Sequence, residues 1–187
     1  MRIISGYFKG KKILEPKDKE TRPLKDLTKE SIFNILNHSN KFKINFEKSI
    51  VLDLFSGVGS FGLECLSRGT QHVTFVENYN GVLPILKKNL NSLKIVKKYE
   101  IIEKNLFNNF NFVFLKNKFD LIFLDPPFKE KKLDFIIDNI SKKKILKKNG
   151  IIIIHRHRKE NDKFSKNFKI FEEKKYGISK IFFGTLN

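Results

Sequence analysis

Residues Val51–Gly62 read VLDLFSGVGSFG, and residues Phe119–Phe128 read FDLIFLDPPF. Each stretch is an apolar strand candidate that runs into a tightly turned polar loop. In doubly wound α/β sheets, ligands bind at the loops that follow the carboxyl ends of parallel strands. The two stretches therefore predict one sheet with two ligand-binding loops at the same edge.

Strand and helix candidates alternate regularly from Ser49 onward. In chain order we expect strand 50–54, helix 60–67, strand 72–77, helix 82–93, strand 99–103, a helical region 106–115, strand 120–124, helix 133–146 and strand 151–155. This alternation favours right-handed βαβ units and a parallel sheet. Two β-rich runs, 168–175 and 178–185, flank Tyr176-Gly177 and predict an antiparallel hairpin at the sheet edge. The pattern indicates an α/β fold of the class I methyltransferase type, with a Rossmann-like, mostly parallel seven-stranded sheet.

Residues 1–46 do not show this alternation of strand and helix candidates. RIISGYFKGKKIL alternates apolar and basic positions around Gly6 and Gly10, which predicts a short hairpin, and residues 25–37 have helical spacing. We therefore expect an N-terminal basic hairpin and helix extension (1–46) followed by a methyltransferase domain (47–187). The extension either covers an edge of the core or helps to hold RNA and closes over the cofactor.

The formal net charge is +18 and the isoelectric point is near 9.9. Clustered basic residues gain affinity for nucleic acids by releasing counterions from phosphates. However, only five of the 38 basic residues are arginines, and the chain has no alanine and 20 phenylalanines. This skew is typical of a coding sequence poor in G and C, which raises the lysine content whatever the function. Charge alone therefore leaves RNA binding open.

Cys65 is the only cysteine, which excludes an intramolecular disulfide and a cysteine-based zinc site. The longest purely aliphatic run, Ile151–Ile154, is far shorter than the ~20 residues of a membrane span. We expect a cytoplasmic protein without a metal or a membrane partner, and a monomer.

Gly57, Gly59 and Gly62 match G-x-G-x-x-G, a pattern that several nucleotide-binding folds share. Glycine allows a sharp turn and a close approach of the backbone to a ligand. Asp53, four residues before Gly57, discriminates between these folds: a strand-end carboxylate there suits the methionine end of S-adenosylmethionine, whereas NAD folds usually place an apolar residue there. We therefore predict that S-adenosylmethionine is the cofactor. Asp53, the three glycines and Phe55, which lies in the same loop, are predicted to bind it.

Polar residues also follow the next two predicted strands. Glu77 closes the second strand, ahead of Asn78, where a carboxylate can accept both ribose hydroxyls. Asn105 follows the third strand, where an amide suits the adenine amino group, and Leu106 can lie against the ring. The alternative for Asn105 is a helix N-cap.

The Asp125-Pro126-Pro127-Phe128 loop suits an exocyclic amino group of a nucleobase. The lone pair of such a nitrogen is delocalised into the ring, so accepting its hydrogen bonds at the Asp125 carboxylate and the Pro126 carbonyl helps it to pyramidalise. Proline fixes φ and contributes no N–H. Phe128 offers a face for a flipped or unstacked base. We predict these four residues to be catalytic.

Basic residues outside these loops are candidate RNA ligands. We predict RNA contacts for Lys9, Lys11, Lys12 and Arg22 in the N-terminal extension. The run 155–158 (His-Arg-His-Arg) follows a predicted parallel strand, and it is either a phosphate-binding element or a solvated basic loop.

Several segments together resemble the RsmD family of bacterial ribosomal RNA methyltransferases. They are RIISG (2–6), KGKKI (9–13), TRP (21–23), ESIFNIL (30–36), VLDLFSGVGSFGLECLSRG (51–69) and LDPPF (124–128). The resemblance implies methylation of N2 of one guanine in 16S ribosomal RNA, on an assembled or nearly assembled small subunit. The chain departs from the family at Ser56, Val58 and Cys65, where alanine is usual, and at His155-Arg156, where glutamate is common.

Three other functions remain open at this stage. An adenine-N6 DNA methyltransferase would use a similar D-P-P-F loop, but 187 residues leave no room for a separate target-recognition domain. A non-catalytic RNA-binding or ribosome-assembly protein is disfavoured by the intact Asp53, Glu77 and Asp125. An NAD-dependent oxidoreductase is disfavoured by the C-terminal hairpin and the D-P-P-F loop.

Overall fold

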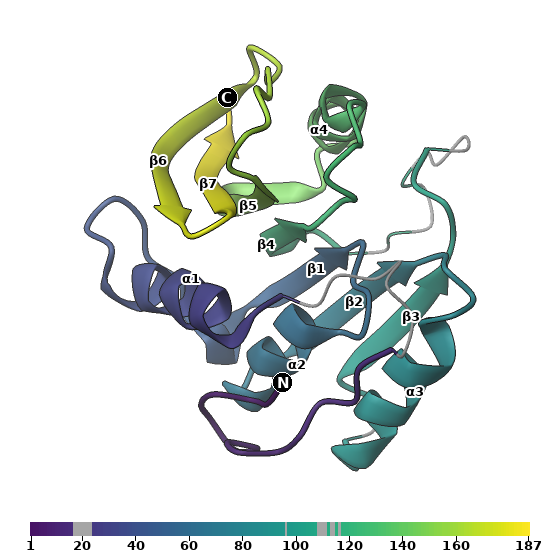
Figure 1. The fold of residues 1–187 in the computed structure, drawn as a ribbon. Helices are drawn as coiled ribbons and strands as arrows, with labels where there is room; N and C mark the ends of the chain where they lie inside the picture. Colours follow the sequence, from purple (N-terminus) through teal and green to yellow (C-terminus); the bar gives the residue numbers. More distant parts are fainter. Residues whose placement is uncertain (17–23, 96, 108–111, 113–114, 116) are drawn as a thin grey trace.

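A computed structural model describes residues 1–16, 24–95, 97–107, 112, 115 and 117–187. Seven strands form one sheet in the order β3-β2-β1-β4-β5-β7-β6 (Figure 1). The strands are β1 (Ile50–Leu54), β2 (His72–Glu77), β3 (Tyr99–Glu103), β4 (Phe119–Leu124), β5 (Leu146–His157), β6 (Phe168–Tyr176) and β7 (Ser179–Leu186). The first five are parallel, and β7 is antiparallel to both β5 and β6. This confirms the predicted sheet and its C-terminal hairpin.

The helices are α1 (Asp26–His38), α2 (Ser60–Ser67), α3 (Leu83–Ser92) and α4 (Leu133–Lys142), and a short 3-10 turn spans Phe46–Lys48. Two expected helices differ from the structure. Helix 133–146 ends four residues early, because Lys144 adopts a φ of +50° and β5 begins at Leu146. Of the helical region 106–115, the described residues Leu106 and Phe107 form a turn rather than a helix, and most of the remainder lies outside the described residues.

The sheet is buried on both faces, so its central strands alternate between two cores rather than between core and solvent. Val51, Leu121 and Ile153 pack under α1, α2 and α3. The neighbouring residues Leu52 and Ile122 pack under α4, on the opposite face. Figure 1 shows α4 on one side of the sheet and the other three helices on the other.

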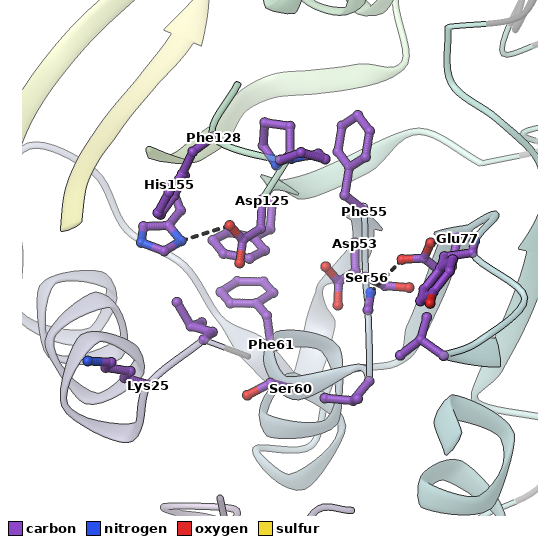
Figure 2. Close-up of a pocket in the computed structure, with 18 of the residues that line it drawn as sticks. Lys25, Asp53, Phe55, Ser56, Ser60, Phe61, Glu77, Asp125, Phe128 and His155 are labelled. Carbon is purple, nitrogen blue, oxygen red and sulfur yellow. Dashed lines mark hydrogen bonds and ion pairs between the residues drawn. The ribbon is translucent and has the colours of Figure 1, made fainter. Parts of the chain in front are cut away.

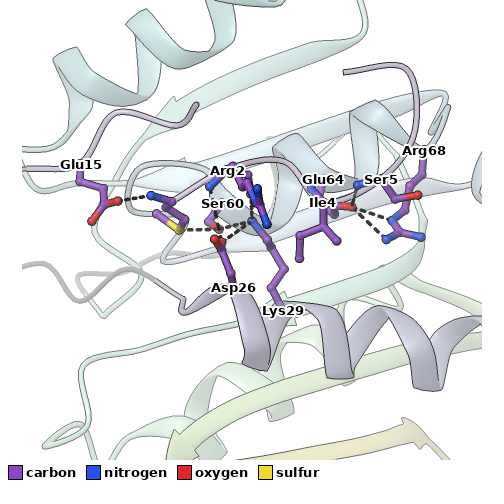
Figure 3. Close-up of polar contacts among 10 residues, drawn as sticks. Arg2, Ile4, Ser5, Glu15, Asp26, Lys29, Ser60, Glu64 and Arg68 are labelled. Carbon is purple, nitrogen blue, oxygen red and sulfur yellow. Dashed lines mark hydrogen bonds and ion pairs between the residues drawn. The ribbon is translucent and has the colours of Figure 1, made fainter. Parts of the chain in front are cut away.

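The N-terminal segment is fixed to α2 by buried charges (Figure 3). Glu64, which is fully buried, accepts the backbone N–H groups of Ile4 (2.7 Å) and Ser5 (3.0 Å) and pairs with Arg68 at 2.9 Å. Lys29 of α1, also fully buried, donates to the carbonyl of Arg2 at 2.7 Å. Burial lowers the pKa of this lysine, and the carboxylates of Glu64 and Asp26 partly oppose that effect.

The expected N-terminal hairpin forms as a loose antiparallel loop. Arg2 and Lys12 make an antiparallel bridge, and the N–H of Ile3 donates to the carbonyl of Lys11 at 2.9 Å. Ile13 is buried in the same core as α1 and α2. Residues 1–16 therefore complete the packing of one face of the sheet.

Candidate active site

A cavity of about 690 Å³ opens at the carboxyl ends of β1, β2, β4 and β5. This volume lies within the usual range for small-molecule sites. Nine of the residues predicted as site residues line it: Asp53, Phe55, Gly57, Glu77, Asn78, Asp125, Pro126, Pro127 and Phe128. The structure therefore brings the glycine loop and the D-P-P-F loop together around one space (Figure 2).

Asp53 is a buried carboxylate with an unused oxygen. Its Oδ2 accepts the backbone N–H of Gly62 at 2.9 Å, and its buried Oδ1 has no hydrogen-bond partner among the described residues. Burial raises the pKa of Asp53 well above 3.8, and the charges of Asp125 and Glu77 raise it further. A cationic ligand that reached Oδ1 would stabilise the ionised form.

The glycine loop depends on close packing against this carboxylate. A Cβ at Gly62 would lie 2.2 Å from the Phe75 ring and 3.0 Å from Asp53 Oδ2, so a larger residue would displace α2 from the sheet. Gly59 begins α2 with a φ of +84°, a conformation that favours glycine. Gly59 and Gly62 do not line the cavity, but they allow the close packing that positions the glycine loop at the cavity.

Glu77 holds the glycine loop to the end of β2. Its Oε2 accepts the N–H of Gly57 at 2.7 Å, and its Oε1 accepts the N–H groups of Asn78 (2.8 Å) and Tyr79 (2.9 Å). A carboxylate has about four acceptor positions, so Glu77 has about one left for a further donor. Glu77 lies at the cavity as predicted, and it also has a structural role that the sequence did not indicate.

Asn105 and Leu106 lie apart from the cavity lining. Asn105 Oδ1 accepts the N–H of Phe107 at 2.8 Å in a local turn, without a helix to cap among the described residues, and Leu106 is buried in the core under α4. The Phe107 ring packs against Phe55, which does line the cavity, with ring centroids 5.5 Å apart. The adenine contacts of Asn105 and Leu106 remain a prediction.

The D-P-P-F loop is held by the end of β5. Asp125 Oδ1 lies 2.8 Å from His155 Nδ1, and the Asp125 N–H donates to the Leu54 carbonyl at 3.3 Å. The Arg156 guanidinium donates to the carbonyls of Pro127 (3.1 Å), Phe128 (2.9 Å) and Glu130 (2.8 Å). The loop is therefore fixed through both its carboxylate and its backbone.

For His155 and Arg156, both interpretations of the run 155–158 were wrong. β5 continues to His157 because β7 pairs with it, so both side chains are buried, with exposed fractions of 6% for His155 and 1% for Arg156. Neither a phosphate ligand nor a solvated loop describes these two residues. The sequence signal was the alternation of β5: Ile151, Ile153 and His155 face one core, and Ile152, Ile154 and Arg156 the other.

Lys9, Lys11 and Lys12, three of the predicted RNA-binding residues, are not among the residues that line the cavity. Tyr7 donates its N–H to Ser67 at the end of α2, and Lys11 Nζ contacts the carbonyl of Ser92 at the end of α3. A helix that follows a parallel strand runs back along it. These helix ends therefore lie at the amino ends of the parallel strands, whereas the ligand-binding loops lie at the carboxyl ends. Lys9 and Lys12 are exposed on this segment, and Arg22 lies outside the described residues.

Two other lysines line the cavity instead. Lys25 precedes α1, and Lys129 follows the D-P-P-F loop, and both are exposed. A single lysine in a lysine-rich chain carries no signal that would mark it as functional. Only their position at the cavity distinguishes these two.

The sheet order, the C-terminal hairpin and the cavity define a class I S-adenosylmethionine-dependent methyltransferase. The family model described as "Conserved hypothetical protein 95" matches residues 1–185. The chain belongs to this family, the RsmD family of S-adenosylmethionine-dependent methyltransferases.

Relatives and solved structures agree with this assignment. Ribosomal RNA small subunit methyltransferase D of Haemophilus influenzae is 33% identical over 183 residues, which cover 95% of this chain and 90% of that protein. Escherichia coli yhhF has a TM-score of 0.77 at 26% identity, covering 98% of this chain and 96% of its own. SMU.776, solved in complex with SAH, has a TM-score of 0.63 at 16% identity, covering 85% of this chain and 50% of its own. The last likeness concerns the fold alone.

Among the described residues, no helix is long and apolar enough to cross a lipid bilayer.

Proposed function

We propose that this protein transfers a methyl group from S-adenosylmethionine to the exocyclic N2 of a guanine in 16S ribosomal RNA of the small subunit. The observation that carries the proposal is that Asp125 of the D-P-P-F loop shares one cavity with Asp53 and Glu77. The name of the Haemophilus relative supports ribosomal RNA as the substrate. The net charge of +18 is in keeping with a polyanionic substrate.

The cofactor fits the acidic residues of the cavity. S-adenosylmethionine supplies an activated methyl group on a positively charged sulfonium, and it also carries an ammonium group and two ribose hydroxyls. Asp53 Oδ1, buried and unpartnered among the described residues, would accept from the ammonium end. Glu77 would accept from one ribose hydroxyl with the about one acceptor position that its three backbone contacts leave open, and would accept from the second only if one of those contacts gives way.

Asp125 would hold the target amine. Its carboxylate accepts an N–H of the guanine amino group, which orients the nitrogen lone pair toward the methyl group. Positioning supplies most of the acceleration, because the methyl donor is already reactive. S-adenosylmethionine would supply the methyl group and leave as the neutral thioether, and Asp125 would accept the proton that the target nitrogen loses.

The experiment is methyl transfer from labelled S-adenosylmethionine to small subunits, free 16S ribosomal RNA and duplex DNA. We expect label in the small subunit as N2-methylguanosine, identified after nuclease digestion. Asp125→Asn should remove the activity, whereas Asp138→Asn on α4, the matched control outside the cavity, should retain it. Label in DNA as N6-methyladenine would favour the DNA methyltransferase alternative, and no transfer to any substrate would contradict the proposal.

A further inference from the structure

Three polar side chains from adjacent strands lie in one row beside the cavity. β4 and β5 pair with Leu124 opposite Ile154, so Asp125 and His155 come next on the two strands. β5 and β7 pair with His157 opposite Ser179 and with His155 opposite Ile181. All three side chains face the α1 and α2 side of the sheet, because side chains alternate along each strand.

The distances connect these groups in series. His155 Nδ1 lies 2.8 Å from Asp125 Oδ1, and His155 Nε2 lies 2.8 Å from Ser179 Oγ. The imidazole is buried, whereas the Asp125 side chain is 17% exposed and therefore open to the cavity. Figure 2 shows the His155 ring directed at the Asp125 carboxylate. The Phe128 ring meets this imidazole edge-on, with centroids 5.7 Å apart.

The hydrogen-bond chemistry selects one arrangement of protons. An ionised Asp125 only accepts, so the proton of the contact must be on His155 Nδ1. In a neutral imidazole Nε2 is then an acceptor, and only the hydroxyl of Ser179 can donate to it. The Asp125 carboxylate thus selects the Nδ1–H tautomer, and the Ser179 hydroxyl holds the ring by donating to Nε2.

We propose that His155 is a positioning residue for Asp125 and that Ser179 acts through it. The Nδ1–H group holds Oδ1 and leaves Oδ2 as the acceptor for the target amine. A carboxylate held at one oxygen does not rotate, so the acceptor keeps its place when the base enters. The inference rests on the proposed function of Asp125, since it assigns the groups that orient that carboxylate.

Serine hydrolases contain the same order of serine, histidine and aspartate, with the serine hydroxyl as the reacting group. The geometry here favours the opposite end. Ser179 is buried, with an exposed fraction of 6%, whereas Asp125 is half-buried and heads the loop that the base is proposed to enter. We therefore assign substrate contact to the Asp125 carboxylate and not to the Ser179 hydroxyl.

The first test measures the proton position without any methyl transfer. Long-range proton–nitrogen NMR spectra of protein labelled in its four histidines report which ring nitrogen carries hydrogen. Loss of one signal set in His155→Phe assigns that residue. We expect the Nδ1–H tautomer in the wild type. An Nε2–H tautomer, with Nδ1 bare, would overturn the inference even if the enzyme methylates RNA.

The second test is kinetic and uses saturating S-adenosylmethionine and small subunits. His155→Phe keeps a ring of similar size beside Phe128 and removes both nitrogens, so kcat should fall about ten- to hundredfold. Its KM for the cofactor and its melting temperature should stay near the wild-type values. His155→Asn restores an N–H donor near the Nδ1 position and should recover part of kcat. Wild-type kcat in His155→Phe, in an enzyme that does methylate RNA, would refute the positioning role alone.

The third test is a double-mutant cycle. If Ser179 acts only through the imidazole, Ser179→Ala should lower kcat in the wild type and leave it unchanged in the His155→Phe background. Two independent structural roles would give additive losses instead, and that result would remove Ser179 from the inference.

Discussion

Arg156 Nη1 donates a hydrogen bond to the carbonyl oxygen of Pro127 at 3.1 Å, from a guanidinium buried at the end of β5. The same side chain pairs through Nε with the buried Asp162 at 2.7 Å. A strand end thus determines the shape of the loop that is proposed to grip the target base.

Replacing this guanidinium should reduce both stability and turnover. Arg156→Met removes one of the two cationic partners of Asp162 and leaves Lys180 Nζ at 4.0 Å, so the loss of unfolding free energy should stay below the about 3–5 kcal/mol typical of a fully broken buried pair. The double variant Arg156→Met/Asp162→Asn removes that charge and should recover much of the stability in urea unfolding. Its kcat should stay low, because three loop carbonyls still lack their donor. Full recovery of kcat in the double variant would show that the loop needs no clamp.

Asp53→Asn should separate stability from cofactor binding. The raised pKa of Asp53 means that the folded protein holds this proton more tightly than the unfolded chain does, so stability falls as pH rises from about 3.8 through the folded-state pKa. Asparagine keeps an acceptor for Gly62 and does not titrate. The melting temperature of the variant should therefore exceed that of the wild type, by a margin that grows as the pH rises from about 3.8 to the folded-state pKa of Asp53.

The same variant should bind S-adenosylmethionine about ten- to hundredfold more weakly, because a charged hydrogen bond is worth roughly 1.5–3 kcal/mol. Calorimetry at neutral pH measures this affinity. Unchanged affinity would place the ammonium group of the cofactor elsewhere.

Glu77→Gln should weaken cofactor binding and loosen the glycine loop together. Glutamine offers one acceptor oxygen where Glu77 uses two for backbone N–H groups. We expect the dissociation constant for S-adenosylmethionine to rise about tenfold or more and amide exchange at Gly57 to accelerate in the free protein. Glu103→Gln, on the exposed end of β3, is the matched control and should leave both values unchanged. If Gly57 exchanges faster while the affinity holds, Glu77 is only a structural residue.

The positions of the lysines predict which basic residues meet RNA. Lys25→Gln/Lys129→Gln at the cavity should weaken small-subunit binding and reduce the slope of log K against log salt by about 0.7 to 0.9 for each lost phosphate contact. Replacing Lys9, Lys11, Lys12 and Arg22 together tests the N-terminal alternative in the same assay. A wild-type slope in the cavity variant and a reduced slope in the N-terminal variant would reverse this assignment.

Local sequence patterns determined most of the fold. Apolar runs of strand length, glycines at turn positions and their spacing predicted the parallel strands and the terminal hairpin, because these signals depend on neighbouring residues. The same is true of Asp53, Glu77 and Asp125, since the first two lie in the last residues of predicted strands and the third directly follows one. The resemblance to the RsmD family agreed with this order of strands and helices and changed none of the predicted elements.

Only the tertiary structure decided what lies behind the D-P-P-F loop. His155 and Arg156 look like surface residues in a lysine-rich chain, and they become buried because β7, more than twenty residues later, pairs with the end of β5. Likewise, α2 and α3 run back along the sheet, and the N-terminal hairpin contacts their last residues. Its turn therefore lies at the end of the strands opposite the cavity. The alternation along β5 assigns each side chain to a face of the sheet, but the length of β5 and the burial of its last residues depend on contacts between distant segments.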